Sequence, residues 1–180
     1  MSQRVTEKLA VIRFREVARD FCALVDDHLS YSAPAFLRRL QTVLPNLSSA
    51  ALALPAIKRP GELDNPHHYS GWKRLFDALS EQLAPYTIYR EVFDPYKAEE
   101  PVNGSLADDL ADLYWDIGPG LSRWDAADPA TRRGIVWNWR FGYESHWGQH
   151  LVDAMRAIHT LLCVHHIEHQ HPPTKWPPSG

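Results

Sequence analysis

Apolar residues recur at spacings of three and four along most of the chain, and this period predicts a protein built from helices. The first helix is predicted over residues 5–28, with its charged side chains off the apolar face. That face consists of Ala10, Phe14, Val17, Phe21, Leu24 and Val25. A second helix is predicted from residue 32, with Pro34 in its first turn and Pro45 as its end. A third is predicted over residues 72–85.

Residues 86–93 are rich in aromatic and β-branched side chains, which is typical of a strand. The sequence offers no second strand to pair with this segment, since residues 94–104 have the composition of a loop. We therefore expect an extended connector that packs on the helices, with at most a trivial β-bridge.

The C-terminal part of the chain predicts one long helix. Asp128 followed by Pro129 is a strong start signal, and apolar periodicity continues from there to about residue 169. A straight helix of that length would measure about 60 Å, at 1.5 Å per residue, which exceeds the needs of a small domain. A kink is therefore expected near one of three glycines, Gly134, Gly142 or Gly148.

These patterns define the expected fold class, which is all-α. A chain of 180 residues is long enough to bury the core of one domain. We expect a single-domain helical bundle of five or six helices over residues 1–170, with a long C-terminal helix. A flexible Pro-rich tail is expected over residues 171–180.

A fourth helix, predicted over residues 105–117, is rich in aspartate. Ser105 is its expected N-cap, and the run 118–120 (Gly-Pro-Gly) its expected end. At 100° per residue Asp109 and Asp116 lie at the margin of the apolar face, and Asp112 lies further round. Two interpretations stay open: a solvated acidic face, or a carboxylate row that holds a hard cation or a basic side chain.

Polar residues also accompany the apolar stripe of the long helix, where Arg140, Glu144 and His159 lie along or beside it. A charge in such a stripe needs a partner. We therefore expect a buried polar network formed by two sets of residues, with Arg140 reaching Asp109 or Asp116. The sets are Asp109, Asp112 and Asp116 on one helix, and Arg140, Glu144 and His159 on the other.

On the opposite face of the long helix the sequence places His146, His150 and Asp153 at i, i+4 and i+7. Two histidines four residues apart can chelate a transition metal, so these three are candidate ligands. The Glu that a zinc protease would place between its histidines is missing. We expect no metal or other cofactor of the protein's own, and Mg²⁺ or Mn²⁺ as the alternative.

Composition narrows the function classes. The formal net charge is −3 and no Lys/Arg cluster with interleaved aromatic residues occurs, which argues against nucleic acid as a partner. No apolar run is long enough to cross a membrane, and no signal-peptide core follows the N-terminus. Cys22 and Cys163 lie in apolar helical settings, so both are expected to be reduced and buried, in a cytoplasmic protein.

Three segments of the chain resemble a bacterial family of unknown function, DUF5063. They are Val92-Phe93-Asp94-Pro95, the Asp-rich run from Ser105 to Tyr114, and Trp147-Gly148-Gln149-His150-Leu151 with the six residues 154–159. The resemblance covers about residues 8 to 160. It implies a helical fold and no known activity.

The function expected from these observations is a cytoplasmic helical binding or regulatory module. It would recognise an unknown partner protein or small ligand through an acidic and aromatic surface, in which Trp115, Trp124 and Trp139 lie off the apolar stripes. The alternative is a metal-dependent hydrolase of the all-α pyrophosphatase type. That enzyme would use the Asp-rich helix, with Asp109, Asp112, Asp116 and Glu144 as its acidic residues.

Overall fold

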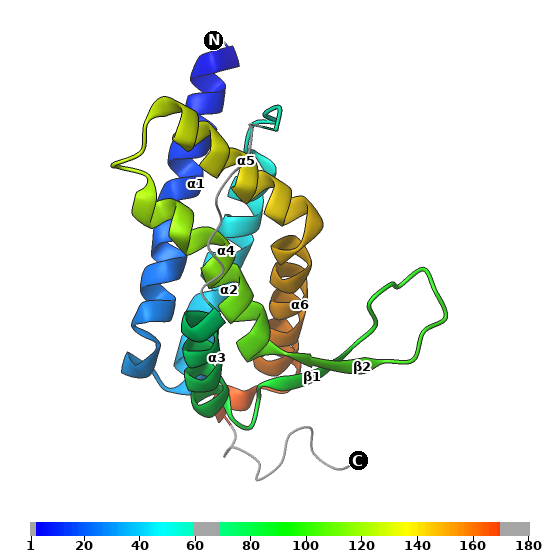
Figure 1. The fold of residues 1–180 in the computed structure, drawn as a ribbon. Coiled ribbons are helices and arrows are strands. Elements are labelled where there is room, and N and C mark those ends of the chain that lie inside the picture. The colour runs from blue at the N-terminus through cyan, green and yellow to red at the C-terminus, as the bar shows by residue number, and fades with distance from the viewer. Residues whose placement is uncertain (1–2, 60–68, 170–180) are drawn as a thin grey trace.

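Six α-helices carry most of the chain in the computed structural model, which describes residues 3–59 and 69–169 (Figure 1). In these residues the helices are α1 (Gln3–Asp26), α2 (Ala33–Leu52), α3 (Tyr69–Leu83), α4 (Leu106–Arg123), α5 (Pro129–Ser145) and α6 (Trp147–His159). Short helical turns are η1 (His28–Ser30), η2 (Thr160–Val164) and η3 (Ile167–His169), and the strands are β1 (Ile88–Glu91) and β2 (Val102–Ser105). The predicted all-α bundle is confirmed. The tail predicted at 171–180 lies outside the described residues.

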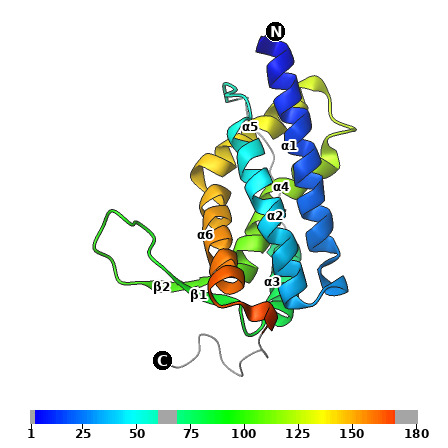
Figure 2. The same ribbon diagram turned by 180° about the vertical axis from the view of Figure 1, so that it is seen from behind.

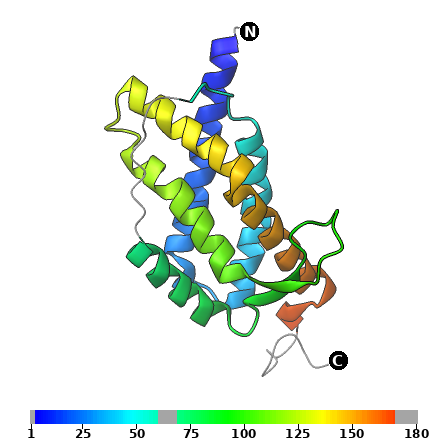
Figure 3. The same ribbon diagram turned by 45° about the vertical axis from the view of Figure 1, so that its right-hand side comes forward.

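The helices form a bundle in which α4 takes a central position. α1 and α2 run antiparallel and pack together (Figure 2). α4 packs against α1, α3 and α6, and Figure 3 shows α4 and α6 side by side. None of the described helices is both long enough and apolar enough to span a membrane.

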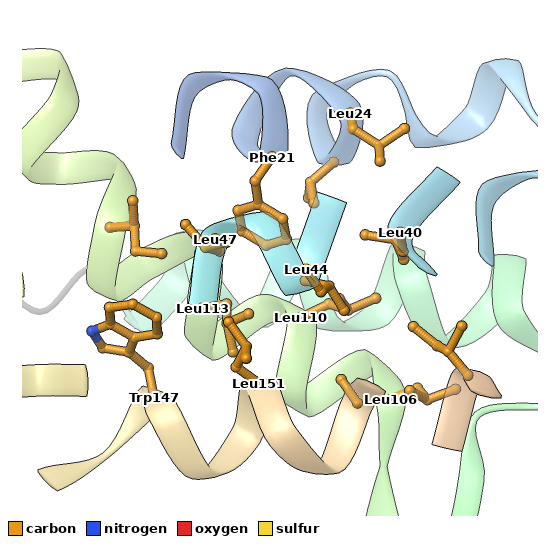
Figure 4. Close-up of a cluster of buried hydrophobic side chains, with 14 of the residues drawn as sticks. Phe21, Leu24, Leu40, Leu44, Leu47, Leu106, Leu110, Leu113, Trp147 and Leu151 are labelled. Atoms are coloured by element: carbon orange, nitrogen blue, oxygen red, sulfur yellow. The ribbon is translucent and has the colours of Figure 1, made fainter. Parts of the chain in front are cut away.

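One layer of apolar side chains joins four of these helices (Figure 4). The labelled residues are Phe21 and Leu24 of α1; Leu40, Leu44 and Leu47 of α2; Leu106, Leu110 and Leu113 of α4; and Trp147 and Leu151 of α6. Burying a side chain of this size contributes about 1.5–3 kcal/mol. The layer therefore fixes the polar faces of α4 and α6 relative to each other.

Two helices continue through prolines that were predicted to end them. α2 passes Pro45, and α4 passes Pro119. A proline inside a helix costs about 3 kcal/mol. In α2 the following turns bury Leu47, Ala50 and Ala51, and this burial offsets the cost.

In α4 two carbonyls at or next to the proline accept hydrogen bonds from side chains. The Ile117 carbonyl accepts a hydrogen bond from Trp139 Nε1 at 3.1 Å, and the Pro119 carbonyl accepts one from Ser122 Oγ at 3.1 Å. Gly120 leaves room for this contact, because a Cβ there would lie 2.7 Å from Trp139 Nε1. Trp139, which the sequence placed off the apolar stripe, is buried as a result.

The long C-terminal helix is divided at the third of the three predicted glycines. α5 ends at Ser145, His146 leaves helical geometry with φ −149° and ψ −85°, and α6 begins at Trp147. Gly148 is required at this corner because a Cβ there would clash with the backbone carbonyl of Tyr143. α6 therefore leaves α5 in a new direction and with a new rotational phase.

The segment predicted as an unpaired connector is half of a hairpin. β1 pairs antiparallel with β2, in a register that places Ile88 opposite Ser105 and Glu91 opposite Val102. The hairpin projects from the bundle (Figure 1), and β2 continues directly into α4. The partner strand was missed because its sequence, Val-Asn-Gly-Ser, contains a single β-branched residue.

The two cysteines differ in their surroundings. Both are free, as expected. Cys22 is partly buried, whereas Cys163 is exposed, so the predicted burial is wrong for Cys163. The reason is local: Cys163 lies in the turn η2, after α6 has ended, and no longer follows the apolar phase of that helix.

Candidate functional site

The start of α4 is built so that its aspartates face α6. Ser105 is the N-cap, as predicted, and its hydroxyl accepts a hydrogen bond from the backbone N–H of Asp108 at 3.4 Å. From this start Asp109, Asp112 and Asp116 follow at spacings of three and four and share one face.

Two histidines of the α5–α6 corner meet these aspartates. His150 Nδ1 donates to Asp109 Oδ1 at 2.9 Å, and His146 Nδ1 donates to Asp116 Oδ2 at 2.7 Å. The other ring nitrogens turn toward a single atom, Asp112 Oδ2, at 3.2 Å for His150 Nε2 and 3.8 Å for His146 Nε2. The two imidazole rings lie 5.0 Å apart.

Side chains from two other elements donate hydrogen bonds to the carboxylates of Asp109 and Asp112. The hydroxyl of Tyr89, on β1, donates to Asp109 Oδ2 at 2.7 Å. The indole N–H of Trp72, on α3, donates to Asp112 Oδ1 at 2.6 Å. Each of these carboxylates therefore has one oxygen fixed by a neutral donor and the other turned toward a histidine.

Burial and charge shift the ionisation of this cluster. Burial raises the pKa of Asp109 to about 6 and outweighs the hydrogen bonds from His150 and Tyr89, which favour the ionised form. Burial alone would lower the pKa of His150, but the hydrogen bond to Asp109 and the charges of Asp109, Asp112 and Asp108 raise it overall. Asp109 and His150 thus compete for the proton between them, within a cluster of net negative charge.

Burial and the nearby carboxylates also shift the pKa values of Asp108 and Tyr89. Burial and then the charge of Asp112 raise the pKa of Asp108. Burial and then the charge of Asp109 raise the pKa of Tyr89, so its hydroxyl stays a donor. Another positive charge in the cluster would relieve this crowding of carboxylates.

The spacing of the atoms suits a metal ion. One ligand atom each from Asp112, His146 and His150 lies within 4.8 Å of the other two. Four-coordinate zinc, with bonds of about 2.0–2.2 Å, requires separations between ligand atoms of about 3.3 Å. The 3.2 and 3.8 Å separations at Asp112 Oδ2 are close to this value. Asp108, Asp109 and His150 form a second group with such spacing.

The structure therefore joins two sets of residues that the sequence kept apart. The three aspartates were predicted to meet Arg140, and the two histidines were placed on the opposite face of the long helix. The histidines were placed on that face because residues 129–169 were treated as one continuous helix, with 100° of rotation per residue throughout. Because the helix breaks at His146, the histidines are turned toward α4 instead.

Arg140 does not reach the aspartates, and the prediction that it contacts Asp109 or Asp116 is wrong. Its guanidinium pairs with Glu144 at 2.9 Å, one turn along α5, and donates to the Leu54 carbonyl after α2. The Arg140–Glu144 pair thus lies outside the cluster, toward α2.

Of the two other candidates, His159 lies apart from the cluster and is exposed at the end of α6. Asp153 borders the cluster, since its charge adds to burial in raising the pKa of Asp109. It accepts a hydrogen bond from Gln149 Nε2 at 2.7 Å and lies 3.7 Å from Arg156. Tyr89 and Trp72 were missed as members of the site, because only the hairpin and the packing of α3 bring them to α4.

A cavity of about 300 Å³ adjoins the cluster, with Asp116 and His146 in its wall. Its other walls carry Arg59 and Arg123, and an aromatic pair in which Trp137 stacks on Phe141 with ring centroids 4.7 Å apart. A small molecule in this cavity would therefore lie beside His146.

Fold and site together define an all-α protein with a histidine–aspartate cluster between two helices. The sequence matches the domain of unknown function DUF5063 over residues 6–164, and the chain belongs to that family. Among curated proteins none matches it. The fold is similar to the crystal structure of protein BF1032 from Bacteroides fragilis, with a TM-score of 0.75 and 24% sequence identity. The similarity covers 92% of this chain and 96% of that one.

Proposed function

We propose that this protein is a helical binding module whose ligand is a divalent transition-metal ion. The ion would be held by His146 Nε2, His150 Nε2 and Asp112 Oδ2. The observation that carries the proposal is the convergence of both Nε2 atoms on one carboxylate oxygen, at 3.2 and 3.8 Å.

The remaining contacts support the same assignment. A histidine that binds a metal usually donates its other ring N–H to a carboxylate or carbonyl, which fixes its tautomer and orientation. His146 and His150 both do so, toward Asp116 and Asp109. A network that only tied α4 to α6 would not require both rings to turn the same nitrogen toward Asp112.

The donor set favours an ion such as Zn²⁺, Fe²⁺ or Mn²⁺ over Ca²⁺, because two of the three ligand atoms are imidazole nitrogens. Three protein ligands leave at least one coordination position for water or a substrate. The cavity beside His146 provides space on that side. Metal-dependent hydrolysis is the chemistry that such a position would support.

The pyrophosphatase-type alternative has less support from the geometry. It needs acids on two neighbouring helices, whereas the side chains that pair directly with the aspartates of α4 are those of His146 and His150. Of its four acids, Asp109 is buried against Tyr89 and His150, and Glu144 pairs with Arg140 outside the cluster. Mg²⁺ is bound by oxygen ligands, so a site for Mg²⁺ alone would not include imidazole ligands.

Thermal unfolding of chelator-treated protein tests the proposal. An ion that binds only the folded state adds about 2.7 kcal/mol at 100 times its Kd. For a chain of this length that corresponds to a rise in Tm of about 5–10 °C. We expect this rise with Zn²⁺ or Co²⁺, and little change with Mg²⁺.

Asp112→Asn and His146→Ala should abolish the rise. His159→Ala should retain it, because that histidine is exposed on the same helix and outside the cluster. The proposal is contradicted if no transition metal raises the Tm, or if the rise survives in both Asp112→Asn and His146→Ala.

A further inference from the structure

A second candidate binding site lies at the end of the bundle where the N-terminus is found, away from the hairpin (Figure 1). It is a groove of about 670 Å³ between the N-terminal half of α1, residues 55–58 after α2, and the first turns of α5. This volume lies within the usual range of about 300–1,000 Å³ for small-molecule pockets.

The groove is strongly basic. Among the described residues that line it none is acidic, and five are cationic: Lys8, Arg15, Lys58, Arg132 and Arg133. The whole chain has a net charge of −3, so the groove is basic although the protein is acidic overall. Within the described part of the chain Lys8, Lys58 and Arg133 have no ion-pair partner.

Arg15 does have a carboxylate partner, but an exposed one that it shares with a second arginine. Its carboxylate partner, Asp125, is 3.1 Å away and 82% exposed, and Asp125 also lies 3.8 Å from Arg19. Burial and then the charge of Arg19 lower the pKa of Arg15. Its Nε is buried without a hydrogen-bond partner among the described residues.

The floor of the groove is apolar. It is formed by Val11, Ile12, Ile57, Trp124 and Val136. Trp124 stacks on the buried Trp139 with centroids 5.5 Å apart, while the guanidinium of Arg15 lies 4.5 Å from the centre of the Trp124 ring. Ile12 is 38% exposed at the groove. A ligand that covered this floor would remove apolar surface from water.

We propose that the groove binds a small anionic amphiphile, with a carboxylate or phosphate head on an acyl or aromatic body. The head would lie among Lys58, Arg132 and Arg133, and the body on the apolar floor. The cationic side chains indicate that the head group is anionic, and the apolar floor indicates that the rest of the ligand is apolar. This site shares none of its lining residues with the His146–Asp112 cluster and does not depend on it.

Calorimetry with probes of matched chain length tests the proposal. We expect decanoate and decyl phosphate, below their micelle concentrations, to bind with one site per chain. Decyltrimethylammonium, which has the same chain and the opposite charge, should bind at least about tenfold more weakly. Equal binding of both charges, or no binding of either anion, overturns the proposal.

Charge-reversal variants locate the binding. Arg133→Glu and Lys58→Glu are surface changes, and each should weaken decyl phosphate binding by about tenfold. Lys97→Glu makes the same change of charge on the hairpin and should leave binding unchanged. Equal loss in Lys97→Glu, or no loss in both groove variants, contradicts the site.

Sedimentation with vesicles separates a soluble ligand from a membrane surface. The proposal predicts that soluble decyl phosphate binds, and that it competes with any attachment to phosphatidylglycerol vesicles. Attachment to those vesicles, but not to phosphatidylcholine vesicles, without any binding of the soluble anions would overturn the small-molecule site and assign the groove to a membrane.

Discussion

Asp112 differs from the other carboxylates of α4 in what its oxygens face. One accepts a hydrogen bond from Trp72, and the other lies opposite the Nε2 atoms of both histidines. Asp109 and Asp116 instead accept from Nδ1 atoms and orient the rings. Four aspartates within nine residues could be recognised in the sequence, but not these separate roles, which depend on which oxygen meets which nitrogen.

At the residue scale the first prediction concerns Tyr89. Tyr89→Phe removes the hydroxyl that donates to Asp109, so His150 is held less firmly in position. Loss of the carboxylate to which a metal-binding histidine donates typically weakens metal binding by about 10–100-fold, and Tyr89 acts through that carboxylate. We expect a rise of up to about tenfold in the Kd for Zn²⁺, measured in competition with a chromophoric chelator. Tyr96→Phe is the control, because that side chain is 96% exposed on the same hairpin, and its variant should bind as the wild type does.

The second residue-scale prediction concerns the thiols. Burial, and then the charge of Asp26, raise the pKa of Cys22 to about 12. At pH 8 only about one Cys22 side chain in ten thousand is then the reactive thiolate, and that fraction grows tenfold per pH unit. Iodoacetamide at pH 8 should modify the exposed Cys163 and leave Cys22 unmodified until the protein is unfolded. Mass spectrometry that finds both modified at equal rates in the native protein would refute this.

At the element scale the rotational phase of the helices decided which predictions succeeded. Within one unbroken helix, counting 100° per residue placed Asp109 and Asp116 at the margin of the apolar face and Asp112 further round, and all three contact a histidine in the structure. Across the corner at His146 the same count gave the wrong face for His146 and His150, because it treated α5 and α6 as one straight helix. The start signals at Ser105 and Asp128 were reliable because they act locally: each side chain accepts from a backbone N–H three residues on.

The corner itself can be tested with two glycines. Gly148→Ala should destabilise the protein by about 1–3 kcal/mol, because the added methyl group meets the Tyr143 carbonyl. Gly118→Ala should change the stability by less than this, because apart from the chain neighbours the nearest atom to the added methyl is 3.9 Å away, while its clash with the ring of Pro119 offsets the helix preference of alanine. Urea unfolding of both variants measures the difference. A Gly148→Ala protein as stable as Gly118→Ala would contradict the described corner.

At the scale of the whole molecule, the class of fold could be predicted because apolar periodicity persists through nearly every helix. Pro45 and Pro119 were wrongly predicted to end their helices, because the burial that carries each helix past its proline depends on tertiary contacts. The hairpin and the histidine–aspartate cluster could not be predicted for the same reason. Tyr89, Trp72 and His150 come from three elements that only the folded chain brings to α4.

The most direct test of the proposed metal site is a crystal structure of the protein grown with Zn²⁺, with data collected at the zinc absorption edge. We predict one strong anomalous peak about 2.0–2.2 Å from His146 Nε2, His150 Nε2 and an oxygen of Asp112. Asp109 and Asp116 should keep their hydrogen bonds to the Nδ1 atoms. Bound zinc at other histidines, such as His165 and His166, with no peak between α4 and α6 would contradict the proposed site.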